Sequence, residues 1–172
     1  MALRRWRLPV LLAVTLLGFS LMTGLEKAGA GPCEYSSQLQ LQFAWSAERV
    51  DAIPADWGAA GRERVRLGIY ADFLYLAGYA SLMAALVGRV AAPRATGSPA
   101  WLSLGRPLAQ AQWLAGALDA VENLLLLGIL NDALNPAPAM WISLMAAVKF
   151  ALVLAGVVYL MAAVTAWFNS AE

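Results

Sequence analysis

The sequence predicts an all-α protein, a four-helix transmembrane bundle with an extramembrane cap between its first and second helices. Composition is the first observation: 61% of the 172 residues are hydrophobic and 13% are charged, whereas soluble domains average about 25% charged residues. The second observation is that four apolar segments each reach the ~20 residues that a spanning helix needs. These segments are continuously apolar, which favours helices over barrel strands, because barrel strands alternate polar and apolar residues.

The chain is expected to form a single membrane domain over residues 1–172. Its apolar runs predict spanning helices over residues 6–25, 67–90, 108–130 and 139–167. A loop rich in proline and glycine separates the second helix from the third. The loop between the third and fourth helices is short, so these two helices are expected to be antiparallel neighbours.

The first apolar segment has two interpretations, a retained membrane anchor or a cleaved signal peptide. Arg4, Arg5 and Arg7 form the basic start that both interpretations need, and the small residues 28–30 would offer a cleavage site. The apolar stretch 8–25 is longer than the roughly 7–15 residues of a signal peptide's apolar region. This length favours a retained anchor.

Residues 26–66 form the longest connection, and they are predicted to be an ordered extramembrane cap. In the stretch 38–43, leucine or phenylalanine alternates with glutamine, a pattern that predicts a strand-like or extended amphipathic segment. Ser46 then precedes a capped helical turn or two. Trp45 and Trp57 suit the lipid–water interface.

The expected location is a cell membrane. A composition rich in alanine, leucine, glycine and arginine is typical of a GC-rich bacterium, so the bacterial inner membrane is expected. The arginines before the first span favour cytoplasmic termini, because the first helix usually dominates orientation. The basic run from Arg62 to Arg66 lies on the opposite side and opposes this orientation.

Several kinds of chemistry are excluded by what the sequence lacks. It contains no histidine, which is the commonest metal ligand and near-neutral acid–base group. Its one cysteine, Cys33, cannot form an internal disulfide or build a zinc site alone. No metal and no cofactor are therefore expected. The net charge of +1 gives no reason to expect a nucleic-acid partner.

Polar and ionisable residues interrupt the last three predicted spans. Such residues are costly in a bilayer and usually face the interior of a helix bundle. On the second and third helices, spacings of three, four or seven residues place them on one face of each helix. At a rise of about 1.5 Å per residue, they all fall between the middle of the membrane and its cap side. The predicted polar cluster comprises Asp72, Tyr75, Tyr79, Asp119, Glu122, Asn123 and Lys149.

Two interpretations of the polar cluster remain open. In the structural one, Lys149 neutralises Glu122 or Asp119, and the network fixes how the helices pack. In the functional one, Glu122 and Asp119 form a catalytic acid–base pair that Lys149 tunes. Asp72 and Tyr75 would then orient a ligand. Three acids face one lysine, so at least one acid is expected to be protonated or hydrated.

Two short motifs carry a resemblance to a known group of proteins. They are Asp72-Phe73-Leu74-Tyr75 and Leu118-Asp119-Ala120-Val121-Glu122-Asn123, followed by Lys149 in the last span. With them, most of the chain resembles a group of small four-helix bacterial integral membrane proteins. The resemblance implies the four-helix fold and the positions of the cluster, and it implies no activity.

Three functions fit these observations. The first is a membrane protein that binds or processes a small apolar or lipid-like ligand, and whether it is an enzyme stays open. The second is an accessory subunit of a membrane complex, docking to a protein partner through residues 26–66. The third is proton-coupled transport, for which four spans are few and for which no repeat or broken helix is evident. Membrane lipid is the partner that all three share.

Overall fold

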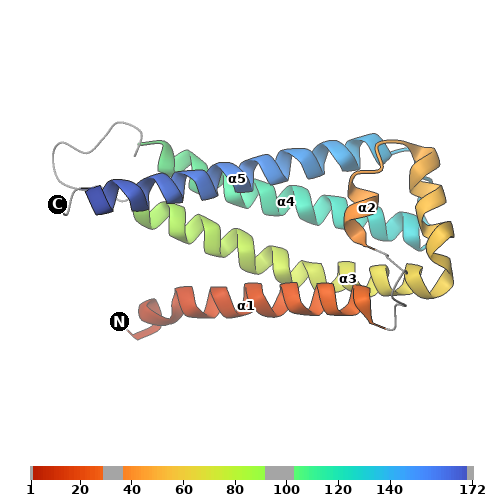
Figure 1. Cartoon of the computed structure of the whole chain (residues 1–172), viewed down its shortest axis with the longest axis horizontal. Coiled ribbons are helices and arrows are strands. Elements are labelled where there is room, and N and C mark those ends of the chain that lie inside the picture. The colour runs from red at the N-terminus through yellow and green to blue at the C-terminus, as the bar shows by residue number, and fades with distance from the viewer. Residues whose placement is uncertain (1, 29–36, 92–102, 170–172) are drawn as a thin grey trace.

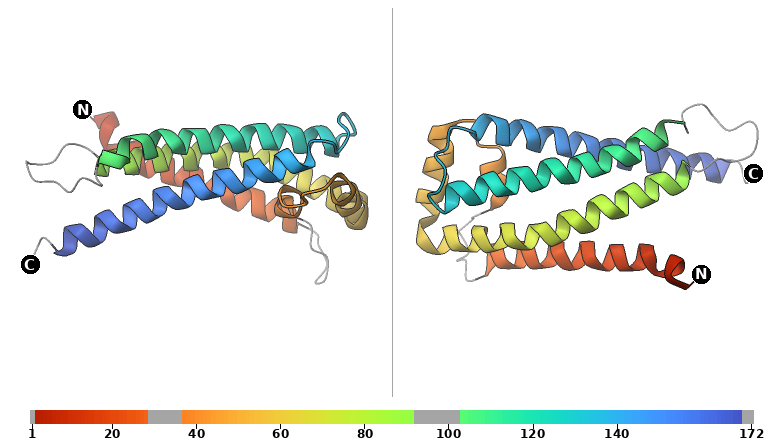
Figure 2. Two further views of the ribbon diagram at one scale, coloured as in Figure 1. Left: turned by 90° about the horizontal axis from the view of Figure 1, so that it is seen from above. Right: turned by 180° about the vertical axis from the view of Figure 1, so that it is seen from behind.

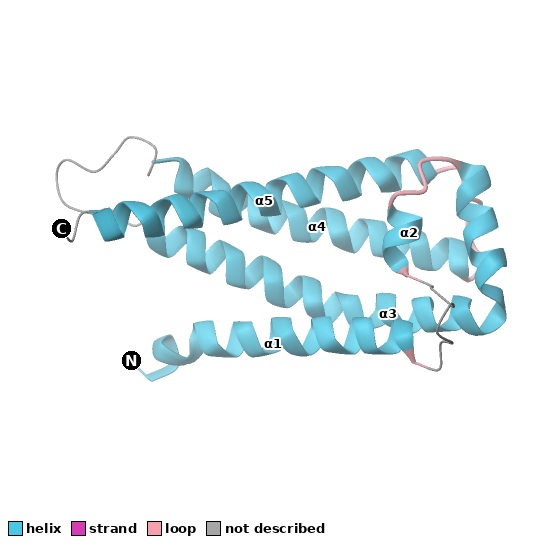
Figure 3. Cartoon of the chain, in the orientation of Figure 1, coloured by secondary structure: helices cyan, strands magenta, loops and turns pink. Residues whose placement is uncertain are grey.

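The computed structural model describes residues 2–28, 37–91 and 103–169. Within these ranges every regular element is a helix and there is no strand, as Figure 3 shows. The prediction of an all-α protein is therefore confirmed.

Four long helices and one short helix make up the described chain (Figure 1). The long helices are α1 (Ala2–Lys27), α3 (Ala47–Val90), α4 (Gly105–Leu130) and α5 (Ala139–Asn169). Each is long and apolar enough to cross a membrane, judged by length and composition. The short helix is α2 (Gln38–Gln42), which lies between α1 and α3 in the chain.

The long helices pack side by side in the order α1, α3, α4, α5. The principal packed pairs are α1 with α3, α3 with α4, and α4 with α5. In Figures 1 and 2, α1 and α5 lie at opposite edges of this arrangement, and both chain termini lie at one end. Helix α2 and the first turns of α3 cover the other end. The bundle is thus closed at one end by the segment that follows α1.

The alternating stretch 38–43 is a helix, so the prediction of a strand-like or extended segment was wrong. Ser37 caps this helix, because its side chain accepts a hydrogen bond from the backbone N–H of Leu39 at 3.3 Å. Gln38, Leu41 and Gln42 are buried on one face, whereas Leu39 is 47% exposed. Residues three and four apart share a helix face, so over five residues the alternation also fits a helix that buries two glutamines.

Helix α3 starts far earlier than the expected span 67–90. Ser46 caps it by accepting a hydrogen bond from the N–H of Arg49 at 3.4 Å, and the helix then runs from Ala47 to Val90. Gly58 interrupts it with φ 65° and ψ −175°. This backbone conformation is open essentially to glycine alone. The bend separates a first part, which crosses the end of the bundle in Figure 1, from the long second part.

Replacing Gly58 with alanine is expected to lower the free energy of unfolding by about 1–2 kcal/mol, because a Cβ at positive φ crowds the backbone. A Cβ here would meet no other atom within 4 Å, so the effect comes from the backbone alone. Unfolding in mixed micelles, followed by circular dichroism, measures it. Gly88→Ala is the control, since a Cβ there would meet only Ala109 Cβ at 3.9 Å. Equal effects of the two changes would contradict the strain at the bend.

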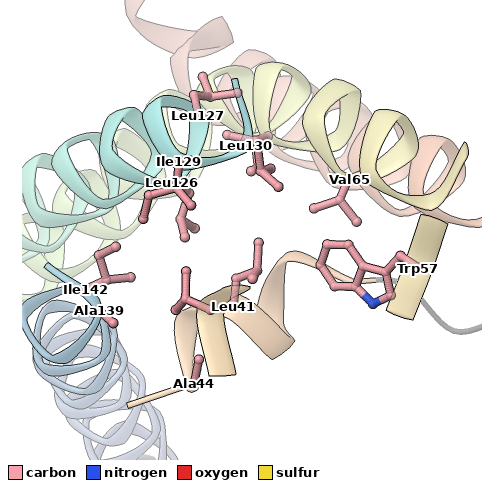
Figure 4. Packing of buried hydrophobic residues seen from close by; sticks show 12 residues of the cluster. Leu41, Ala44, Trp57, Val65, Leu126, Leu127, Ile129, Leu130, Ala139 and Ile142 are labelled. Atoms are coloured by element: carbon pink, nitrogen blue, oxygen red, sulfur yellow. The ribbon is translucent and has the colours of Figure 1, made fainter. Parts of the chain in front are cut away.

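A hydrophobic core lies where α2 and the start of α3 cover the bundle (Figure 4). Leu41 projects from α2 toward leucines and isoleucines of α4 and α5, including Leu126 and Ile142. Trp57 is only 8% exposed in this core, so its predicted place at the lipid–water interface was wrong. Its indole N–H donates to Gln40 Oε1 at 3.0 Å. These contacts fix α2, and with it Gln38, above the helices that carry the polar cluster.

Candidate functional site

Lys149 is the centre of the first of two buried networks. Its ammonium group contacts Asp119 Oδ1 and lies 3.1 Å from Glu122 Oε1. Lys149 and Asp119 are each 4% exposed, and Glu122 is fully buried. The Tyr79 hydroxyl donates to the other oxygen of Asp119 at 3.0 Å. This Lys149 network therefore joins α3, α4 and α5 through one ammonium, two carboxylates and the hydroxyl of Tyr79.

Asp72 is the centre of the second network, and its direct partners are neutral. Its Oδ2 accepts hydrogen bonds from Asn123 Nδ2 at 2.7 Å and from Gln38 Nε2 at 3.1 Å. Gln38 Nε2 also donates to Asn123 Oδ1 at 2.6 Å. All three side chains are buried. This Asp72 network joins α2, α3 and α4.

Two residues of the site escaped sequence reasoning. In the sequence Gln38 is one of several glutamines in an amphipathic stretch. In the structure it belongs to the Asp72 network. Glu26 marks the start of the connection in the sequence, but it lies in the last turn of α1. There its Oε1 accepts a hydrogen bond from the backbone N–H of Gln38 at 2.8 Å. The sequence shows only a polar residue at the end of one predicted element and another at the start of the next, and the fold is needed to show that they meet.

Tyr75 contributes an aromatic ring to the site. Its ring centroid lies 5.1 Å from that of Tyr79 on the same helix and 5.7 Å from that of Phe19 on α1. Tilted ring pairs at such distances are favourable. The three rings form a continuous aromatic surface between α1 and α3, next to the carboxylates of Asp72 and Asp119.

A cavity of about 430 Å³ opens beside both networks. Its polar side includes Asp72, Asp119 and Lys149, together with Gln38. Glu122 does not line the cavity; it contacts Lys149, and its own side chain is fully buried. The structure thus separates the two predicted catalytic carboxylates: Asp119 borders the cavity and Glu122 does not.

The apolar side of the cavity comes mainly from the two edge helices. Phe19 and Met22 line it from α1, and Phe150 and Val153 line it from α5. Small-molecule sites typically have volumes of about 300–1,000 Å³ and a mostly apolar lining with a few placed polar groups. The cavity fits this description in size and in lining.

The arrangement offers charge and hydrogen bonds at one end of an apolar space. Lys149 is held by two carboxylates, so it supplies a fixed ammonium group. Asp72 is held by amides, so it supplies a carboxylate without an ammonium in direct contact. Within the described residues, no group of three or more cysteine, histidine, aspartate or glutamate side chains is placed to hold a metal ion.

Comparisons with known proteins give no family assignment. No protein-family model, no curated protein sequence and no solved structure matches the chain significantly. A functional proposal therefore rests on the geometry of the two networks and of the cavity.

Proposed function

We propose that the protein is an integral membrane protein, crosses the bilayer four times, and binds a small lipid-like ligand in the cavity beside Asp72 and Asp119. The observation that carries the proposal is the cavity itself, which has apolar walls and a charged, hydrogen-bonding floor. An amphipathic molecule has the same two parts. Its polar group would meet the floor and its apolar body would lie along the walls.

The outer surface of the long helices supports a membrane location. Large apolar side chains are exposed along α1, α4 and α5, among them Leu16, Leu124 and Met161 at 56%, 61% and 64%. Such surfaces are unfavourable in water and suit lipid tails. In the proposed topology the termini lie in the cytoplasm of a bacterium, and α2 with the first part of α3 forms the extramembrane cap.

The walls suggest how the ligand enters. Helices α1 and α5 both line the cavity, although they belong to opposite edges of the bundle and are not a principal packed pair. A ligand dissolved in the bilayer would pass between them. The proposal requires α1 to remain part of the folded protein, because Phe19 and Met22 form one wall.

In this proposal the two carboxyl groups of the predicted catalytic pair have different roles. Asp119 borders the cavity and would contact the ligand, whereas Glu122 would position Lys149 from behind. If the bound ligand is converted chemically, Asp119 is the acid–base group of the predicted pair that can reach it. Tyr79 holds Asp119 through its hydroxyl.

Native mass spectrometry of the protein released from micelles tests the proposal. The wild-type protein purified from membranes is expected to carry a bound small amphipathic molecule. Val153→Trp should lose it, because Val153 lines the cavity and the larger ring fills that space. Val158→Trp is the matched control, since Val158 lies on the same helix, is 57% exposed and does not line the cavity.

Two results would overturn the proposal. One is a wild-type protein that carries no molecule and takes up no added amphiphile. The other is equal retention by Val153→Trp and wild type, which would place the bound molecule elsewhere on the surface.

A further inference from the structure

The polar cluster has an excess of negative groups. Asp72, Asp119 and Glu122 are three buried carboxyl groups, and Lys149 is the one buried ammonium among the residues of the two networks. Lys149 directly contacts Asp119 and Glu122. Both direct partners of Asp72 are amides, which carry no charge. Burying a carboxylate is costly, and a nearby cation or a proton lowers that cost further than neutral hydrogen-bond donors do.

The other charged residues that line the cavity do not supply that compensation. Glu26 and Lys27 both line it, one acid and one base, and they balance each other. Counting the lining residues, three carboxyl groups face two ammonium groups, and Glu122 lies behind Lys149 as a further acid. Asp72 is therefore the group at which a positive charge from outside the chain would be most favourable.

Asp72 presents acceptors toward the cavity that it lines. Among the described residues both amide donors reach Oδ2, which leaves Oδ1 as a further acceptor. Gln38 is 4% exposed and lines the same cavity, and its Oε1 accepts no hydrogen bond from the described residues. Two acceptors of the Asp72 network thus have no donor among the described residues, which matches a ligand group that carries N–H bonds.

Aromatic rings complete the match to a cation. Phe19, Tyr75 and Tyr79 line the cavity next to Asp72, and the faces of such rings attract positive charge. The site already contains one such contact, because Lys149 Nζ lies 5.3 Å from the centroid of the Phe150 ring.

We infer that the cavity binds a protonated amine attached to an apolar body, with Asp72 as its counter-ion. The inference rests on the proposed function, because it names the class of ligand for the same cavity. The ammonium would donate to Asp72 and Gln38, and the apolar body would extend toward Met22 and Val153.

The test is isothermal titration calorimetry on the protein in nanodiscs, with empty nanodiscs as the blank for partitioning into lipid. The probes are octylamine, 1-octanol and octanoate, which share one chain and differ in head group. Octylamine is expected to bind saturably, and about tenfold or more tightly than the other two. Asp72→Asn should lose this preference, because it keeps the shape and removes the charge. Asp132→Asn is the control, since Asp132 pairs with Arg62 on the exposed surface.

Three results would overturn the inference. Equal binding of the three probes to wild type, abolished by Val153→Trp, would leave the proposed lipid-like site intact and reject the cationic ligand. Full octylamine preference in folded Asp72→Asn would reject Asp72 as counter-ion. Binding of none of the probes would reject the cationic ligand, and native mass spectrometry of the untreated protein would decide the proposed function separately. If Asp72→Asn does not fold, the selectivity of the wild type alone decides the inference.

Discussion

Replacing Lys149 with methionine is expected to lower the free energy of unfolding by about 3–5 kcal/mol, the cost of leaving buried charges without their partner. Lys149 contacts both Asp119 and Glu122, and all three side chains are at least nine-tenths buried. Methionine keeps the length of the side chain and removes the ammonium. Reversible unfolding in mixed micelles, followed by circular dichroism, measures the loss.

The matched control for Lys149→Met is Arg62→Met. Arg62 pairs with Asp132 at 3.1 Å, but both side chains are more than one third exposed. Exposed ion pairs contribute about 0–1 kcal/mol, so this change should be nearly silent. If Lys149→Met were equally silent, the charges would not hold the fold together, and their retention in the bundle would point to the ligand.

Recovery of stability should need two further changes. In Lys149→Met with Glu122→Gln, Asp119 still lacks its cation, so we expect only partial recovery. Adding Asp119→Asn removes the last unpaired charge of the Lys149 network, and the triple variant should regain most of the loss, because replacing a whole buried ion cluster can be near neutral. Full recovery in the double variant would show that Asp119 does not need Lys149.

The four long helices could be predicted because hydrophobicity is continuous over each of them. The start of α3 could not be placed, because its first part carries charged residues such as Glu48 and Asp51 and resembles a solvated loop or a short helix. Gly58 also conceals that helix is present on both sides of it, since a glycine in a polar stretch usually indicates a turn. In the structure Gly58 has non-helical dihedral angles and forms the kink between the two parts of α3.

The polar cluster could be predicted in part, because helical periodicity fixes faces within one helix. It placed Asp119, Glu122 and Asn123 on one side of α4, where all three are buried. Periodicity does not say which neighbour meets which residue, so the division into a Lys149 network and an Asp72 network was not foreseeable. Gln38 belongs to a helix of five residues, which is too short for a periodic signal.

The cavity leaves no trace in the sequence. It exists because α1 packs on α3 while α5 packs on α4, so the two edge helices line a space without packing closely on each other. Its apolar lining, such as Phe19 and Val153, has the same composition as a surface that faces lipid. A cavity lining can be told from a lipid-facing surface only when the packing partner of α1 is known. That partner is α3, and the close backbone contact between α1 and α3 fixes how they pack.

That close contact leads to the second large expected effect, from Gly18→Leu on α1. A Cβ at Gly18 would lie 2.5 Å from the backbone nitrogen and 2.6 Å from the Cα of Tyr75. These are backbone atoms of α3, so no side chain can move aside and the two helices must separate. We expect a loss of ~3 kcal/mol in the free energy of unfolding, the upper end of the range for overpacked sites.

Gly24→Leu is the control on the same helix, because a Cβ at Gly24 would meet no atom within 4 Å. It should be neutral or slightly stabilising, since leucine favours a helix more than glycine does. Gly18→Leu should also weaken binding in the cavity, because separating α1 from α3 displaces the wall formed by Phe19 and Met22. Calorimetric titration with octylamine measures that second effect. Equal stability and equal binding in both variants would contradict the packing of α1 against α3, and with it the wall that the proposed site requires.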